Sequence, residues 1–159
     1  MEEFTNGFKE YNKKVKDKIL ILGGSGFIGK AILHWIKSNN SLEYLVIDKK
    51  EINLHETSAI TYLDKIIKKF EPTIVLVLAA VKRQDGDSID LRLVNNSISD
   101  NITNVLGKYN IHTIYISSCA VYGEKNYQKN YSELSPLSPT SEYGRHKIYS
   151  EKLYVKRID

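Results

Sequence analysis

The sequence is short of the features that mark secreted, membrane-spanning and metal-binding proteins. Its 159 residues include a single cysteine, Cys119, so no disulfide can form within the chain and nothing requires an oxidising compartment. The longest apolar runs, such as 74–81, are far too short to cross a bilayer, and residues 1–18 are too polar for a secretory signal. The four histidines share no metal-ligand spacing, so we expect no metal. These absences favour a cytoplasmic protein with no membrane partner.

The sequence also lacks a concentration of charge of one sign. The net charge is +4, and the densest basic group is interrupted by Asp17; it consists of Lys13, Lys14, Lys16 and Lys18. A nucleic-acid-binding protein needs a continuous basic stripe or patch, so we expect a solvated surface and no nucleic-acid partner. A mildly basic domain also suits a polyanionic ligand such as a dinucleotide.

What the sequence does contain is an alternation of strand-like and helix-like segments. Continuous aliphatic runs predict strands at 18–22 and 73–77, and further strands are expected at 43–48 and 112–117, with a very short additional strand at 51–54. Helical spacing of apolar residues predicts helices at 27–38, 57–70, within 88–109 and at 141–157, after a short amphipathic lead-in within 1–17. Strands without polar alternation are typical of sheets that helices cover on both faces. We therefore expect one α/β domain over residues 18–159, built on a doubly wound parallel sheet.

A glycine-rich segment, 23–29, lies between the first predicted strand and the first helix. Gly23 permits a tight turn, Gly26 lets the backbone approach a pyrophosphate, and Gly29 lets helix and strand pack closely. The helix N-terminus adds unpaired N–H groups and a partial positive charge. The remaining residues expected at this dinucleotide site are Ser25, Phe27 and Ile28. As an alternative, glycines also occur in plain strand-to-helix turns.

The spacing Gly-x-x-Gly-x-x-Gly, followed by Phe-Ile, resembles the extended short-chain dehydrogenase/reductases. This family modifies sugar nucleotides, and the resemblance covers about residues 18–157. It implies a Rossmann fold, NAD or NADP as cofactor and a nucleotide-sugar substrate. Family members continue beyond this point, so the resemblance implies that the C-terminal strands and the substrate domain are missing. The missing strands would leave a sheet edge unpaired, which favours association as a homodimer or with a missing C-terminal half.

The residues after the second predicted strand bear on the choice of cofactor. Asp48 could bind the adenosine ribose hydroxyls of NAD, or it could simply cap a turn. Lys49 and Lys50 could instead neutralise the 2′-phosphate of NADP. By the resemblance, Asn53 and Leu54 occupy the place near the adenine, where an asparagine could still form a hydrogen bond. The choice between NAD and NADP stays open.

The resemblance places further residues around the cofactor. Three of them close the strand 73–77 with side chains small enough for a dinucleotide to lie across them: Leu78, Ala79 and Ala80. Lys82 matches a position where related epimerases have a lysine, although a solvated lysine fits equally well. Asn95, with Asn101 six residues later, matches the family's pair of helix asparagines. Asn95 would then support the active site through backbone and water contacts, the alternative being a helix-surface asparagine.

A tyrosine and a lysine four residues apart begin the last predicted helix. Tyr143 and Lys147 would project from one face of that helix. A phenol is a poor base at neutral pH, but a lysine ammonium one turn away, together with a nicotinamide ring, would lower its pKa. Tyr143 could then exchange a proton with a sugar hydroxyl or carbonyl while the nicotinamide exchanges hydride. The resemblance places the family's serine at Ser118, which would hold the same oxygen, and Lys147 would also bind the nicotinamide ribose.

Other polar residues near this pair are less suited to chemistry. Tyr122 is expected to pack against the strand end, close enough to line a substrate pocket. Cys119 has no evident histidine partner and is expected to be buried, and His146 is expected to face solvent.

Two functions follow from these residues. The first is an NAD(P)-dependent epimerase, dehydratase or reductase acting on a nucleotide sugar. Dehydration is the least favoured of these reactions, because Cys119 and Ala120 stand where a dehydratase would need an acid pair. The second is a catalytically silent dinucleotide-binding fragment or assembly module.

Overall fold

The computed structural model describes residues 17–39, 42–81, 86–123 and 130–158. Within these residues, the chain forms one parallel sheet of four strands: β1 (Lys18–Leu22), β2 (Glu43–Ile47), β3 (Ile74–Val77) and β4 (His112–Tyr115). The strand order is β2-β1-β3-β4. All three neighbouring pairs are parallel, with Leu20 opposite Leu45 and Val75, and Leu76 opposite Ile114. The predicted α/β parallel sheet is confirmed.

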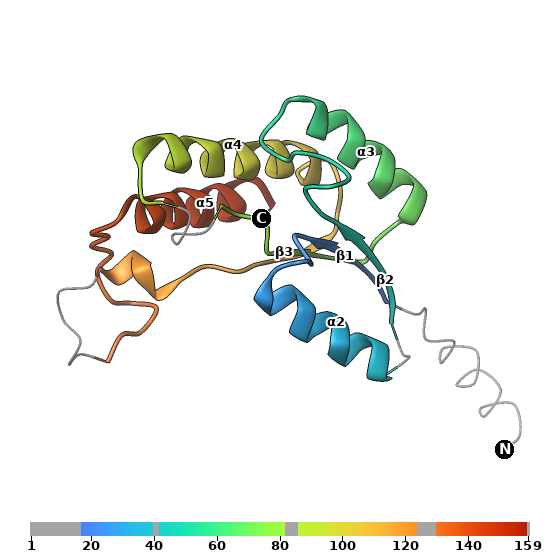
Figure 1. Ribbon diagram of the computed structural model, residues 1–159, viewed down its shortest axis with the longest axis horizontal. Helices are drawn as coiled ribbons and strands as arrows, with labels where there is room; N and C mark the ends of the chain where they lie inside the picture. Colours follow the sequence, from blue (N-terminus) through green and yellow to red (C-terminus); the bar gives the residue numbers. More distant parts are fainter. Residues whose placement is uncertain (1–16, 40–41, 82–85, 124–129, 159) are drawn as a thin grey trace, which may run out of the picture.

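Helices cover both faces of this sheet (Figure 1). On one face lie α3 (Ser58–Phe70), α4 (Ile89–Leu106) and α5 (Glu142–Ile158), and on the other lies α2 (Phe27–Asn39). A short 3-10 helix, η2 (Cys119–Tyr122), follows β4. The predicted lead-in helix before Asp17 lies outside the described residues. Within the described part of the chain, no helix combines the length and the apolar character that crossing a membrane requires.

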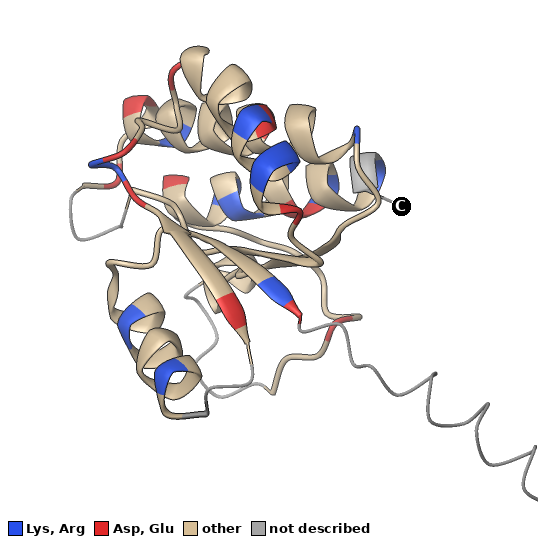
Figure 2. Cartoon of the chain, turned by 90° about the vertical axis from the view of Figure 1, so that its right-hand side faces the viewer, with Lys and Arg blue, Asp and Glu red and all other residues tan. Residues whose placement is uncertain are grey.

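The core has two unequal parts, one on each face of the sheet. The larger part packs Leu20, Leu22 and Val75 against α3, α4 and α5, and the smaller part packs Ile21 and Leu76 against α2. Because alternate residues of β1 and β3 are buried on opposite faces, these two strands show no polar alternation in the sequence. The charged residues, coloured in Figure 2, are spread over the helices, the strand ends and the connecting segments.

The predicted strand at Glu51–Leu54 is wrong. This segment forms turns, in which the N–H groups of Glu51 and Ile52 donate to Asp48 O at 3.0 and 3.2 Å. The carbonyl of Leu54 accepts from the Asn101 side chain at 3.0 Å, where a strand would have a neighbouring strand as its partner. The alternation of Ile52 and Leu54 resembles that of a strand, but Leu54 reaches the core from a turn.

Candidate functional site

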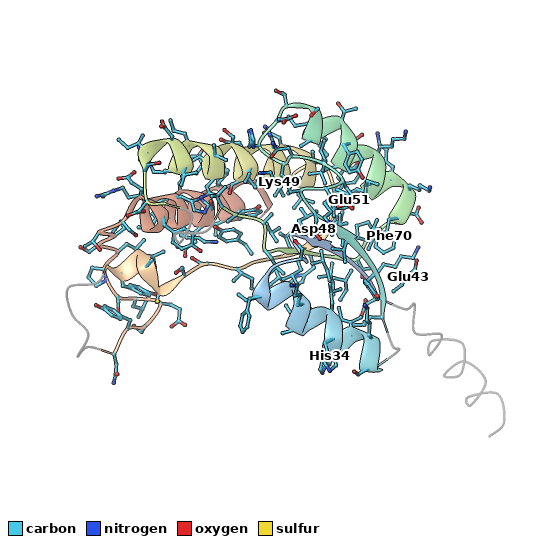
Figure 3. All side chains as sticks on the ribbon, viewed as in Figure 1. His34, Glu43, Asp48, Lys49, Glu51 and Phe70 are labelled. Carbon is cyan, nitrogen blue, oxygen red and sulfur yellow. The ribbon has the colours of Figure 1, made fainter. Side chains whose placement is uncertain are left out.

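The carboxyl ends of the four described strands meet at one edge of the sheet, where open α/β sheets bind their ligands. Segment 23–29 follows β1, Asp48 follows β2, segment 78–81 follows β3, and Ser118 lies three residues beyond β4. The fold therefore brings the predicted residues from four separate parts of the chain to the same edge. Figure 3 labels Asp48, Lys49 and Glu51 at this end of β2, and Glu43 at the opposite end.

The three spaced glycines have different surroundings. Gly23 has a φ of 90°, and a Cβ there would lie 2.7 Å from the backbone nitrogen of Ala79. A Cβ on Gly29 would overlap the carbonyl oxygen of Gly24. A Cβ on Gly26, by contrast, would approach nothing nearer than Gly23 O at 3.8 Å. The fold thus requires glycine at 23 and 29, whereas the space beside Gly26 at the start of α2 is left open.

Asp48 connects the end of β2 to the glycine loop. Its Oδ1 accepts a hydrogen bond from the backbone N–H of Ser25 at 3.1 Å, and its own N–H donates to Glu51 Oε2 at 2.8 Å. Its carbonyl also accepts from the following turn, so the turn alternative holds for the Asp48 backbone. The carboxylate is nevertheless fixed beside the loop that would hold a dinucleotide.

The other predicted cofactor residues divide into exposed and buried groups. Lys49 and the side chains of Phe27 and Ile28 are exposed. Asn53 Nδ2 donates to Glu56 Oε1 at 3.0 Å, and Leu54 packs in the core, where little of its side chain remains for a ligand.

Asn95 and Asn101 are buried, so the alternative of helix-surface asparagines is wrong. Asn95 is 3% exposed; its Oδ1 accepts from Val81 N at 2.7 Å and its Nδ2 donates to Val81 O at 3.1 Å. Asn101 Nδ2 donates to the carbonyls of Leu54 and Glu56, both at 3.0 Å. Asn95 therefore fixes the segment Leu78, Ala79, Ala80 and Val81 at the strand edge, while Lys82 lies outside the described residues.

Ser118, Tyr143 and Lys147 are held by the packing of η2 against α5. Ser118 is the N-cap of η2, and its Oγ accepts from Ala120 N at 3.2 Å. Gly144 allows close contact, because a Cβ there would lie 2.5 Å from Ala120 O. Lys147 Nζ donates to Ile116 O at 2.7 Å and lies 5.5 Å from the Tyr143 ring centroid. The fold thus brings the serine segment against the Tyr-Lys helix.

Burial shifts the pKa values of both helix residues. Lys147 is 4% exposed, and burial lowers its pKa to about 8 despite the opposing charge of Glu151. For Tyr143, burial raises the pKa, and the negative charge that Cys119 carries when ionised raises it further. The expected lowering of the Tyr143 pKa is therefore not seen in the chain alone. Neutral Tyr143 is the form suited to donating a proton.

Two expectations about the neighbouring residues are wrong. His146 does not face solvent: it is 1% exposed, because its face of α5 packs against α4. Its Nδ1 lies 3.2 Å from Ser150 Oγ, which in turn lies 2.7 Å from Ser99 Oγ on α4. Burial and the Lys147 charge lower the His146 pKa to about 3. Cys119 is exposed rather than buried, because it begins the η2 turn at the rim of the site.

Sequence reasoning missed two contacts that hold this region. Asp87 Oδ1 accepts from the Tyr143 backbone N–H at 2.9 Å, and Ser117 Oγ donates to Glu151 Oε1. Each contact joins residues more than 30 positions apart, so no local pattern could indicate it. Among the described residues, no three histidine, cysteine or acidic side chains gather to form a metal site.

One family model and several known proteins match most of this chain. The model of the NAD dependent epimerase/dehydratase family matches residues 19–158. A UDP-glucose 4-epimerase of Dictyostelium discoideum is 30% identical, over 86% of this chain and 46% of that protein. A putative UDP-glucose 4-epimerase of Methanocaldococcus jannaschii is 31% identical, over 87% of this chain and 50% of that protein. The chain thus spans about half the length of these curated relatives.

Solved structures show the same fold. A dTDP-4-dehydrorhamnose reductase from Bacillus anthracis in complex with NADP matches with a TM-score of 0.78 and 19% identity, over 92% of this chain and 51% of that chain. A UDP-glucose 4-epimerase from Brucella ovis in complex with NAD matches with a TM-score of 0.72 and 18% identity, over 88% of this chain and 47% of that chain. At these identities the likeness shows the fold alone, and one of these proteins binds NADP while the other binds NAD.

Proposed function

Because the chain belongs to the NAD dependent epimerase/dehydratase family, we propose that it forms the nucleotide-binding part of an NAD(P)-dependent enzyme that epimerises or reduces a nucleotide sugar. The observation that carries this proposal is the arrangement at the strand edge. An open space at Gly26 lies at one end of the edge, and a buried Lys147 beside Tyr143 lies toward the other. A buried lysine is unfavourable for folding, which supports a functional reason for its place.

The residues present fit a dinucleotide. The start of α2 at Gly26 would hold the pyrophosphate, segment 78–81 would lie beneath the nicotinamide half, and Lys147 would bind the ribose. When bound, the nicotinamide would supply hydride transfer. Ser118 would orient the reacting oxygen of the sugar, Tyr143 would exchange its proton, and the Lys147 charge would stabilise the phenolate.

We further propose that the chain prefers NAD to NADP. The Asp48 carboxylate is fixed beside the glycine loop, and the Glu51 carboxylate bonds the same residue's backbone. Ribose hydroxyls could donate to Asp48, whereas a 2′-phosphate at this place would meet two carboxylates held by hydrogen bonds and would have only the exposed side chains of Lys49 and Lys50 beside them to offset these charges. Calorimetric titration of the chain with NAD and NADP measures the preference. Asp48→Ala should weaken NAD binding more than NADP binding, and equal effects would reduce Asp48 to a turn residue.

The raised pKa of Tyr143, which leaves the phenol a poor base, favours a second candidate, a dinucleotide-binding module without turnover. Both candidates bind the cofactor, so turnover of UDP-, GDP- and dTDP-sugars separates them.

Replacement of Tyr143 tests the proposed chemistry directly. Tyr143→Phe removes the proton-exchanging hydroxyl and keeps the ring, so we expect turnover to fall by about 100-fold or more. The NAD affinity, measured by calorimetry, should stay close to that of the unaltered chain. Turnover that survives in Tyr143→Phe would remove Tyr143 from its proposed role. A chain that binds NAD but turns over none of these sugars would support the module without turnover.

A further inference from the structure

The first turn of α5 is held by a carboxylate from a distant part of the chain. Asp87 Oδ1 accepts a hydrogen bond from the Tyr143 backbone N–H at 2.9 Å, across a separation of 56 residues. The next N–H, that of Gly144, donates to Ser141 Oγ at 3.0 Å, the usual contact of an N-cap serine. The first N–H groups of a helix have no partners within the helix. Tyr143 therefore depends on Asp87 for a hydrogen bond that α5 cannot supply.

An ion pair joins the same turn to α4, beside a second ion pair within α5. Glu142 lies between two arginines, with Oε2 2.8 Å from Arg92 Nε and Oε1 2.9 Å from Arg145 Nε. Arg92 belongs to α4, and the carboxylate and both guanidinium groups are at most half exposed. One helical turn along α4, Asn95 holds both backbone groups of Val81. The segment that begins α4 thus contacts the strand edge on one side and α5 on the other.

This arrangement bears on where the Tyr143 hydroxyl lies. Helix ends fray, and Tyr143 is the second residue of α5. Proton exchange requires the phenol to be held to within about half an ångström of the productive position. Asp87 opposes fraying twice, since its carboxylate accepts the hydrogen bond and its negative charge faces the positive end of the helix dipole. A small pocket between the two helices is lined by Asp87, Asn95 and Tyr143 together with parts of α4.

Resting on the proposed function, we propose that Asp87 is a positioning residue for Tyr143. It fixes the first turn of α5 to the segment that precedes α4, and so fixes the phenol relative to the strand edge where a dinucleotide would lie. Asp87 itself does not touch the reacting atoms.

Three variants of the purified chain test this role. Asp87→Ala removes the acceptor, and Asp87→Asn keeps an acceptor oxygen without the charge. As a control, Asp90→Ala removes a carboxylate from the nearby first turn of α4. The first readout is the hydrogen-exchange rate of the Tyr143 amide by NMR. We expect exchange to be roughly fivefold faster or more in Asp87→Ala, and close to the unaltered rate in Asp87→Asn and Asp90→Ala.

The second readout reports the ring itself and needs no turnover. With 3-fluorotyrosine placed at position 143, the ¹⁹F resonance should shift or broaden in Asp87→Ala and return in Asp87→Asn. Where turnover is measurable, kcat in Asp87→Ala should fall by roughly tenfold while KM changes little. If Asp87→Ala does not fold, Asp87→Gln displaces the acceptor by one methylene and should move the same readouts.

The proposal would be overturned if the exchange rate of the Tyr143 amide and the ¹⁹F resonance were both unchanged in Asp87→Ala, or in Asp87→Gln where that variant replaces it. Faster exchange with an unchanged resonance would overturn it too, because Asp87 would then be a helix cap only. A folded chain without turnover would contradict the proposed function, yet the exchange rate and the resonance would still decide the role of Asp87.

Discussion

Glycines in one loop can look alike in a sequence and serve different ends. The atoms around Gly23 and Gly29 leave no room for a Cβ. A Cβ on Gly26, in contrast, would approach nothing nearer than 3.8 Å. The spacing of the three glycines predicts a different role for each of them, because it is typical of a tight turn followed by the start of a helix. It could not show that the fold itself has no need of glycine at position 26. A substitution at Gly26 can therefore test cofactor binding without disturbing the fold.

Gly26→Ala should separate cofactor binding from folding. The added methyl meets no protein atom within 3.8 Å, so we expect the free energy of unfolding to be retained or slightly raised. The methyl would occupy the space proposed for the pyrophosphate, so the NAD affinity should fall by about tenfold or more. Calorimetry measures the affinity and urea unfolding measures the stability.

Gly29→Ala is the matched control for this experiment. Its methyl would overlap the Gly24 carbonyl, so the variant should lose stability whether or not NAD is present. Unchanged NAD affinity in Gly26→Ala would contradict the proposal that the glycine loop binds the pyrophosphate.

At the scale of elements, the strands were predictable and the contacts between helices were not. β1 and β3 are largely continuous aliphatic runs, a pattern that follows from burial on both faces, whereas β4 alternates between exposed and partly buried residues. Segment 51–54 was mistaken for a strand because the Asn101 amide that supports its turn lies 47 residues away. The neighbouring lysine makes His146 look solvent-facing in the sequence, yet α5 packs on α4 and buries His146, while Lys147 is buried against the end of β4. The structure of segment 51–54 and the burial of His146 both depend on tertiary packing, which the local sequence does not show.

The burial of His146 between α4 and α5 predicts sensitivity to acid. Its pKa in the folded chain is about 3, below its ordinary value of 6.5. The unfolded chain therefore takes up the proton first, and stability is lost as the pH falls from 6.5 toward 3. At pH 5 this loss amounts to about 2 kcal/mol. Above pH 6.5 both states are neutral at this residue, and the effect disappears.

His146→Phe should remove this part of the acid sensitivity. We expect the loss of unfolding free energy between pH 7.5 and 5, measured with urea, to be smaller by about 2 kcal/mol in this variant. His34→Gln alters an exposed histidine on α2, labelled in Figure 3, and should keep the full loss. An equal loss in all three proteins would mean that His146 is not held neutral.

At the scale of the whole molecule, the two faces of the sheet are covered unequally. Three described helices lie on one face and α2 alone on the other (Figure 1). β4 is the last strand in the described order, and Ile114 on this strand is 41% exposed. Strand alternation places Ile114 on the side of Ile116, which packs in the smaller core with α2. The edge of the sheet at β4 therefore carries an exposed isoleucine and is unpaired among the described strands.

Such an edge predicts association of the chain. We expect the weight-average mass in sedimentation velocity to rise with concentration, because β4 can pair with a second copy and cover Ile114. Ile114→Lys should reduce this rise without changing the circular dichroism spectrum, since a charged side chain on an edge strand opposes pairing. Val155→Lys is the control, because Val155 is exposed on α5, over the opposite face of the sheet. If association were reduced only in Val155→Lys, the contact between copies would involve α5 and not β4. A mass independent of concentration would show that the edge at β4 does not pair.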